Sequence, residues 1–119
     1  MIEYPKPKPK KKKKSHPRSI LQEKDGTCYL CRRLEHDYRI HRDLEEHHAF
    51  PGYPRRQISE QYGFKVFLCP EHHRIGPAAV HNNIDNMRLI QQDVQEEYEL
   101  THTRSEWMAI MGRNYLTNC

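Results

Sequence analysis

Two short motifs pair residues of the types that bind metal ions. Cys28 and Cys31 are separated by two residues, and Cys69 and His72 repeat this spacing later in the chain. The spacing lets two ligands converge on one ion from a tight turn, and two such turns supply the four ligands of a closed tetrahedral zinc site. The motifs therefore predict a structural zinc ion bound by all four residues, with buried cysteines beside a chance histidine as the alternative.

Histidines form a second group. His47 and His48 are adjacent, and His73 and His81 follow further along the chain. A neutral imidazole, with an unperturbed pKa of about 6.5, can bind a divalent ion or accept a proton near neutral pH. The group thus indicates a metal ion together with a base, unless the adjacent pair is simply solvated in a charged loop. Because neighbouring strand residues point to opposite faces, His47 and His48 can share one site only where the strand bends.

The surrounding pattern predicts the elements that hold both groups. We expect, in chain order, a turn at 25–26, an irregular segment over 32–44, a strand over 44–50, a helix over 55–62 and a strand over 64–68. Gly63 would end the helix that precedes the second strand. A further helix that opens at Pro70 would carry His72 and His73.

The segment after His73 decides whether His81 can join the same ion. On an unbroken helix these two histidines would lie about 12 Å apart, which is too far for a shared ion. Gly76 and Pro77 stand between them and should break the helix. We therefore expect the chain to fold back after Pro77 and to return His81 to the ion.

Two helices are predicted at the C-terminal end. Apolar residues at spacings of three or four form one stripe over 84–98, which we expect to pack in the core. Asn82 or Asn83 would cap this helix. Thr103 and Glu106 form a capping box that begins the second helix.

Composition limits what the rest of the chain can do. The chain has 119 residues, of which 35% are apolar and 30% charged, and its mean hydropathy is −1.06. It has neither an apolar run long enough for a membrane span nor the apolar N-terminal stretch of a secretory signal, so we expect a cytoplasmic protein without a membrane partner. A small chain this poor in apolar residues also needs a metal ion or similar support to fold.

The charge is concentrated at one end. Residues 1–18 carry eight basic side chains and one acidic side chain, which gives this segment +7, whereas the remainder sums to −3. We expect 1–18 to be a disordered basic arm and 19–119 to be a single folded domain. The lysines expected to contact nucleic-acid phosphates are Lys10, Lys11, Lys12, Lys13 and Lys14; a solubilising tail is the alternative. Arg55 and Arg56 would either contact phosphates or form a solvated helix face.

The order of these motifs resembles a known family. A Cys-x2-Cys pair, His-His at the end of a strand and Leu-Cys-x2-His-His at the start of a helix are similar to the HNH, or His-Me finger, endonucleases, especially the short HNH proteins of phages and mobile elements. The resemblance covers 28–81. It implies an α+β fold: a small zinc-stapled ββα-metal (HNH) domain, here with two additional C-terminal helices and the basic arm.

The resemblance also implies a function and residue roles. The protein would be a metal-dependent DNA endonuclease that leaves 5′-phosphate and 3′-hydroxyl ends. His48 would be the general base. The ligands of a catalytic divalent ion such as Mg²⁺ would be His47 and His73, with His81 as the further expected ligand, while the cysteine motifs would hold the structural Zn²⁺. The chain departs from the family where Lys65 and Val66 replace an Asn that braces the loop bearing the base.

Other functions fit parts of the sequence. A non-catalytic zinc-binding module that binds nucleic acid or a partner protein accounts for the cysteine motifs and the lysine arm, but not for the other histidines. A structural adaptor in phage assembly is a third interpretation. The expected partners are DNA and, in the phage setting, other phage or mobile-element proteins; the sequence predicts no oligomeric state.

Overall fold

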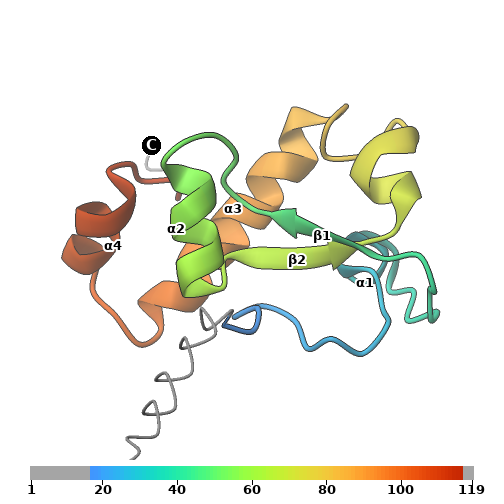
Figure 1. The fold of residues 1–119 in the computed structure, drawn as a ribbon, viewed down its shortest axis with the longest axis horizontal. Coiled ribbons are helices and arrows are strands. Elements are labelled where there is room, and N and C mark those ends of the chain that lie inside the picture. The colour runs from blue at the N-terminus through green and yellow to red at the C-terminus, as the bar shows by residue number, and fades with distance from the viewer. Residues whose placement is uncertain (1–16, 117–119) are drawn as a thin grey trace, which may run out of the picture.

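A two-stranded antiparallel sheet lies at the centre of the protein, with helices around it (Figure 1). The computed structural model describes residues 17–116; the predicted arm lysines Lys10–Lys14 lie outside this range. The elements, in chain order, are α1 (Tyr29–Glu35), β1 (Glu45–His48), α2 (Arg55–Tyr62), β2 (Lys65–Leu68), the π-helix η1 (Glu71–Ile75), α3 (Ile84–Glu99) and α4 (Arg104–Met111). The fold is a small mixture of helices and a two-stranded sheet.

The register of the sheet determines which side chains share a face. Glu45 pairs with Leu68 at one end of the ladder, and His48 pairs with Lys65 at the other. Because side chains alternate along a strand, His47 lies on the face of Val66 and Leu68, whereas His48 lies on the face of Lys65. The sheet therefore directs the two adjacent histidines in opposite directions.

α2 fills the connection between the two strands, and it ends where the sequence predicts. Gly63 follows its last residue in the left-handed conformation, with φ of 77°. A Cβ atom there would come within 2.2 Å of the Arg18 carbonyl oxygen, so only glycine fits. The Gly63 carbonyl also accepts a hydrogen bond from the Ile20 backbone N–H at 3.0 Å, which holds the first described residues against this corner.

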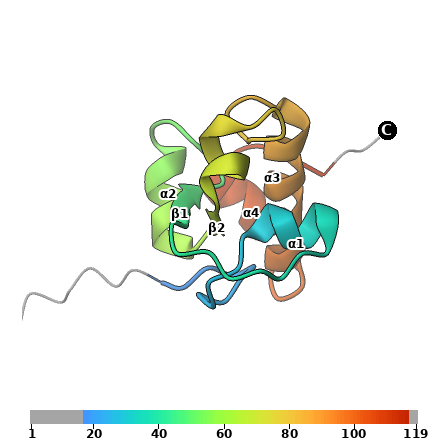
Figure 2. The ribbon, with the colours of Figure 1, turned by 90° about the vertical axis from the view of Figure 1, so that its right-hand side faces the viewer.

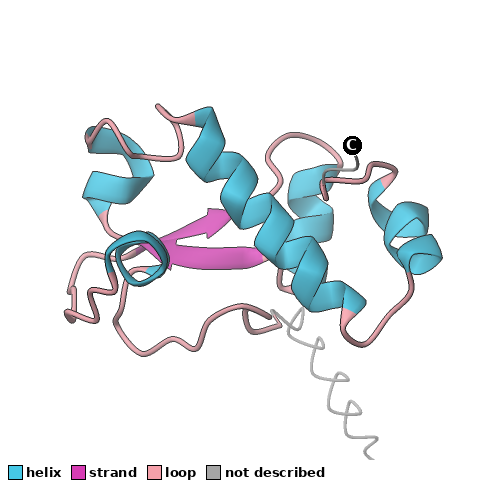
Figure 3. Cartoon of the chain, turned by 180° about the vertical axis from the view of Figure 1, so that it is seen from behind, coloured by secondary structure: helices cyan, strands magenta, loops and turns pink. Residues whose placement is uncertain are grey.

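The two C-terminal helices begin at the predicted caps. Asn83 accepts a hydrogen bond from the Asn86 backbone N–H, and Thr103 and Glu106 form the complete capping box. α3 lies along one side of the sheet, as the view from behind shows (Figure 3). The predicted apolar stripe of α3 is buried from Met87 onward. Ile84 is 62% exposed, because the first residue of the helix lies outside the core.

The core of the protein is largely aromatic. Trp107 of α4 packs edge-on against Phe50, and Phe50 and Phe64 flank the hairpin connection; all three are fully buried. These residues come from segments far apart in the sequence. They tie α4 to the strand ends, which fixes the position of β1 relative to the C-terminal helices.

One secondary-structure prediction is wrong in part. The segment 32–44 is not irregular throughout, because α1 runs from Tyr29 to Glu35 and packs beside β2 (Figure 2). The Cys28 carbonyl accepts the Arg32 N–H at 3.1 Å, so the turn between the first two cysteines continues directly into a helix. Among the helices of residues 17–116, none has both the length and the apolar character required to cross a bilayer.

Candidate metal centres

Four buried side chains converge from the start of α1, the end of β2 and η1. They are Cys28, Cys31, Cys69 and His72, here called the cysteine cluster, and their ligand atoms all lie within 4.8 Å of one another. The Nδ1 atom of His72 is 3.3 Å from Cys31 Sγ and 3.4 Å from Cys69 Sγ. Three sulfurs and one nitrogen at this spacing match the closed tetrahedral donor set of structural zinc sites. The cluster could therefore hold a metal ion such as zinc.

Burial favours the neutral form of two thiols in this cluster, those of Cys31 and Cys69. It raises the pKa of Cys31, which the neighbouring Cys28 and Cys69 sulfurs raise further, and it also raises the pKa of Cys69. A metal ion would reverse this preference, because thiols bind metals as thiolates and release their protons. The Glu35 carboxylate lies 3.6 Å from the other ring nitrogen of His72, where a negative charge favours binding of a cation through Nδ1.

Three histidines form a second group, here called the histidine cluster: His47, His73 and His81. The Nε2 atoms of His73 and His81 are 3.2 Å apart, and the His47 ring lies edge-on to both rings. The predicted return of the chain is thus confirmed. η1 ends at Ile75 before Gly76, and the following turn brings His81 back to His73.

The ring nitrogens of the histidine cluster approach one another. Nδ1 of His73 lies 2.8 Å from the Glu45 carboxylate and donates a hydrogen bond to it, so Nε2 is the nitrogen of a neutral His73 ring that carries a lone pair. Nε2 of His47 is buried and has no hydrogen-bond partner among the described residues. Burial, reinforced by His73 and His81, lowers the pKa of His47 to about 3. A neutral, unpartnered imidazole nitrogen is suited to bind a divalent ion.

His48 belongs to a different set of contacts. Its Nε2 lies 2.7 Å from Glu60 Oε1 and 3.9 Å from Glu46 Oε1. The buried Lys65 ammonium is 3.3 Å from a carboxylate oxygen of each of these two glutamates. Because a carboxylate accepts the hydrogen bond, Nε2 of His48 carries the proton, and Nδ1 is left as the basic nitrogen.

β1 does not bend at the adjacent histidines. The ladder runs regularly through His47 opposite Val66 and His48 opposite Lys65. The two imidazoles therefore lie on opposite faces of one strand, and only His47 joins the histidine cluster. The bend that a shared site would require is absent from β1.

The predicted phosphate-binding arginines differ in their surroundings. Arg55 is half-buried and its Nε has no hydrogen-bond partner among residues 17–116, whereas Arg56 is exposed. The lysines Lys10–Lys14 remain a prediction, because they lie outside the described residues.

Sequence reasoning missed the residues that orient the histidines. Glu60 contacts His48, Glu45 contacts His73, and Glu35 approaches His72. Glu45 precedes the adjacent histidines by two residues, and alternation along a strand would have placed it on the face of His47. Glu60 gave no comparable signal, because only the packing of α2 on the hairpin brings it to His48.

The comparisons with family models, curated proteins and solved structures give no significant match. The functional interpretation of this chain therefore depends on the geometry of the two clusters and on the groups around them.

Proposed function

We propose that this protein is a metal-dependent DNA endonuclease with an HNH-type site. The observation that carries the proposal is the buried, unpartnered Nε2 of His47, which faces His73 and His81. A buried polar atom without a partner costs roughly 1–3 kcal/mol, and a native protein rarely retains one without use. A divalent ion bound by the histidine cluster would satisfy it.

In this proposal, His48 is the general base. Nδ1 takes a proton from a water molecule, which then attacks the phosphorus of the scissile bond. Glu60 holds the ring in place and favours the imidazolium that forms, because its carboxylate lies 2.7 Å from Nε2. Glu60 and Lys65 take the place of the bracing Asn that the family resemblance led us to expect.

In an in-line displacement, attack and departure occur on opposite sides of phosphorus. His47 and His48 point to opposite faces of β1, so one phosphate meets both only where it lies across the end of the strand, of which His48 is the last residue. His47, His73 and His81 would hold the divalent ion, which would supply positive charge for the leaving 3′ oxygen. Glu45 keeps Nδ1 of His73 protonated, so the lone pair of its Nε2 stays directed at the cluster.

The cysteine cluster has a supporting role in the same proposal. All four of its side chains are buried, so the ion that they bind has no open position for a substrate. Cys69 and His72 flank the start of η1, and His73 is the next residue along it. A zinc ion there would fix the position of His73 without taking part in the chemistry.

Plasmid cleavage tests the proposal. Zinc-loaded protein with added Mg²⁺ or Mn²⁺ should nick or cut a supercoiled plasmid, and His48→Ala protein should do so about 10²–10⁴ times more slowly. The matched control is His102→Ala, which removes an exposed histidine far along the chain from both clusters. If parent and His48→Ala protein cleave at equal rates, the activity belongs to a contaminant and the proposal fails.

The second candidate is a non-catalytic zinc module that binds nucleic acid or a partner. The buried cysteine cluster favours it as strongly as it favours the nuclease. The distinguishing feature is the histidine cluster, for which this alternative has no use. Zinc-loaded protein that binds DNA but never cleaves it, with any divalent ion, would support this second function.

A further inference from the structure

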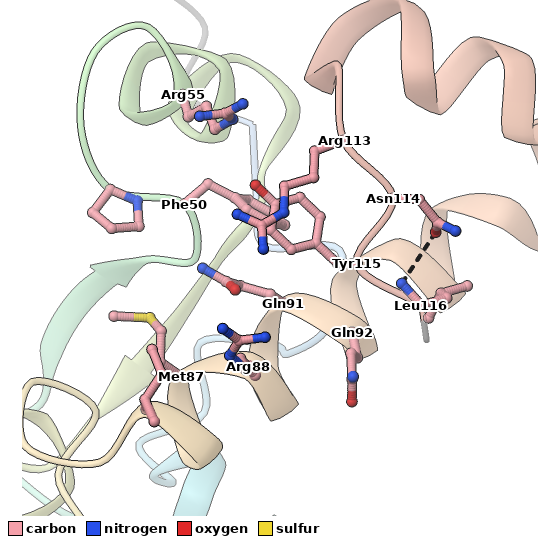
Figure 4. A pocket seen from close by; sticks show the side chains of 12 residues that line it. Phe50, Arg55, Met87, Arg88, Gln91, Gln92, Arg113, Asn114, Tyr115 and Leu116 are labelled. Atoms are coloured by element: carbon pink, nitrogen blue, oxygen red, sulfur yellow. Dashed lines mark hydrogen bonds between the residues drawn. The ribbon is translucent and has the colours of Figure 1, made fainter. Parts of the chain in front are cut away.

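A cavity of about 630 Å³ lies apart from both metal clusters, between α2, α3 and the segment that follows α4 (Figure 4). Three arginines line it, and each comes from a different one of these segments: Arg55, Arg88 and Arg113. Phe50 and Tyr115 form part of the wall, and their ring centroids are 4.7 Å apart. We call this cavity the arginine pocket.

The positive charge of the arginine pocket is not balanced within the described residues. Its lining contains no aspartate or glutamate. Other arginines of the protein do find carboxylates: Arg33, Arg74 and Arg104 each pair with one at 3.1 Å or less. Within residues 17–116, none of the three pocket arginines has such a partner. Like charges that share a cavity repel, and a bound anion relieves this repulsion.

One of these arginines also has a buried donor without a partner. The Nε of Arg55 is inaccessible to solvent and makes no hydrogen bond among the described residues. Apart from Nε2 of His47, it is the only such side-chain atom in that part of the chain. Because this atom is closed to solvent, it gains an acceptor from the arginine pocket only when the Arg55 side chain turns toward a bound anion.

Packing restricts the direction of a second arginine. The Arg113 guanidinium lies over the Tyr115 ring, 5.0 Å from its centroid, and Tyr115 in turn packs on Phe50. Figure 4 shows the guanidinium groups of Arg55, Arg88 and Arg113 around one space, with the amide of Gln91 beside them. Ordered cations of this kind lose less freedom when they bind an anion.

We propose that the arginine pocket binds a phosphate-bearing ligand of nucleotide size. Guanidinium forks match phosphate oxygens in geometry and form strong charge-assisted hydrogen bonds. The cavity lies within the range of about 300–1,000 Å³ that is typical of small-ligand sites, so it holds more than one phosphate group. The phosphate can come from a free nucleotide or from a DNA strand. This binding does not depend on the proposed nuclease activity.

The position of the pocket makes a DNA strand a natural source. Phe50 follows His48 by two residues, so their Cα atoms are at most about 7 Å apart along the chain. A strand with its scissile phosphate at His48 would bring a neighbouring nucleotide toward the pocket wall. A free nucleotide would instead make the pocket a separate site.

Binding measurements on the zinc-loaded full chain, without added Mg²⁺, test the proposal. The probes are inorganic phosphate, adenosine triphosphate and a short single-stranded oligonucleotide. The binding of each probe is measured by calorimetry or fluorescence. The variants are Arg55→Gln, Arg88→Gln and Arg113→Gln. The control is Arg42→Gln, which removes the same charge from an exposed position outside the pocket and outside the predicted nucleic-acid contacts. Arg88→Lys keeps the positive charge but removes the planar guanidinium that can donate two parallel hydrogen bonds to phosphate oxygens.

We expect each pocket variant to bind the triphosphate or the oligonucleotide about tenfold or more weakly, and Arg42→Gln to bind like the parent. Triphosphate binding that depends on the pocket identifies a free nucleotide as the source, and oligonucleotide binding alone identifies DNA. The proposal is overturned if no probe binds, or if Arg42→Gln weakens binding as much as Arg55→Gln. Because cleavage is not measured, failure of the nuclease proposal leaves this result unchanged.

Discussion

The cysteine cluster and the histidine cluster are neighbours that differ in nearly every respect. Adjacent residues of η1 serve them, since His72 belongs to the first and His73 to the second. The cysteine cluster has four ligands, all buried. The histidine cluster has three, and they range from the buried His47 to the exposed His81. The first group is closed around its centre, and the second is open to solvent on the side of His81.

In the proposed function, this difference separates a supporting role from a chemical one. A closed set of thiolates and imidazole would hold an ion that substrate cannot reach, and its binding free energy would stabilise the fold. A set of three imidazole nitrogens would leave coordination positions on a bound ion for water and phosphate oxygens. One short helix thus carries candidate ligands for both clusters. Loss of the cysteine cluster should therefore also disrupt the histidine cluster, whereas loss of the histidine cluster should leave the cysteine cluster intact.

Loss of the cysteine cluster should have the largest effect. Structural zinc contributes about 10–16 kcal/mol in small domains, which is as large as the whole stability of about 5–15 kcal/mol expected of a folded domain. Strong chelation, or Cys28→Ser, should therefore unfold the protein, as measured by circular dichroism together with zinc content. Cys119→Ser is the matched control, because it makes the same chemical change outside the cluster. Metal-free protein with an unchanged spectrum would contradict the structural role.

Changes in the histidine cluster should leave the fold intact and alter the metal requirement. His47→Ala removes one of three ligands, so we expect cleavage to need a higher Mg²⁺ or Mn²⁺ concentration and to recover partly when the ion is raised. His48→Ala removes the base, so extra metal should not restore its rate. The measurement is cleavage rate against metal concentration for both variants. Rescue of His48→Ala by metal, without rescue of His47→Ala, would show that their roles are reversed.

Local patterns were enough to predict which residues form the two clusters. The cysteine motifs each lie within one turn, and the break at Gly76–Pro77 is a property of those two residues. Capping by Asn83 and by the Thr103–Glu106 pair depends equally on near neighbours. Such features can be read from sequence because the atoms that interact are a few residues apart.

Contacts between distant segments could not be predicted in this way. Glu60 reaches His48 only through the packing of α2 against the hairpin. Arg55, Arg88 and Arg113 give no common pattern in the sequence, and only the packing of the C-terminal segment on α2 and α3 brings them to one cavity. The helical part of 32–44 was missed because α1 is a short helix that begins inside the turn between Cys28 and Cys31.

The smallest effect on cleavage is expected for substitution of Glu60, a residue that sequence reasoning missed. Glu60→Gln keeps a hydrogen-bond acceptor near His48 but removes the charge that favours its imidazolium, so we expect cleavage to slow by about tenfold, with metal requirement and zinc content unchanged. Glu46→Gln is the matched control. Both glutamates lie 3.3 Å from the Lys65 ammonium, but Glu46 is 3.9 Å from His48 whereas Glu60 is 2.7 Å away. Equal losses in the two variants would indicate that the charge balance around Lys65, and not the orientation of His48, determines the rate. A loss confined to Glu60→Gln, with an altered pH profile of cleavage, would establish Glu60 as the positioning residue of the base.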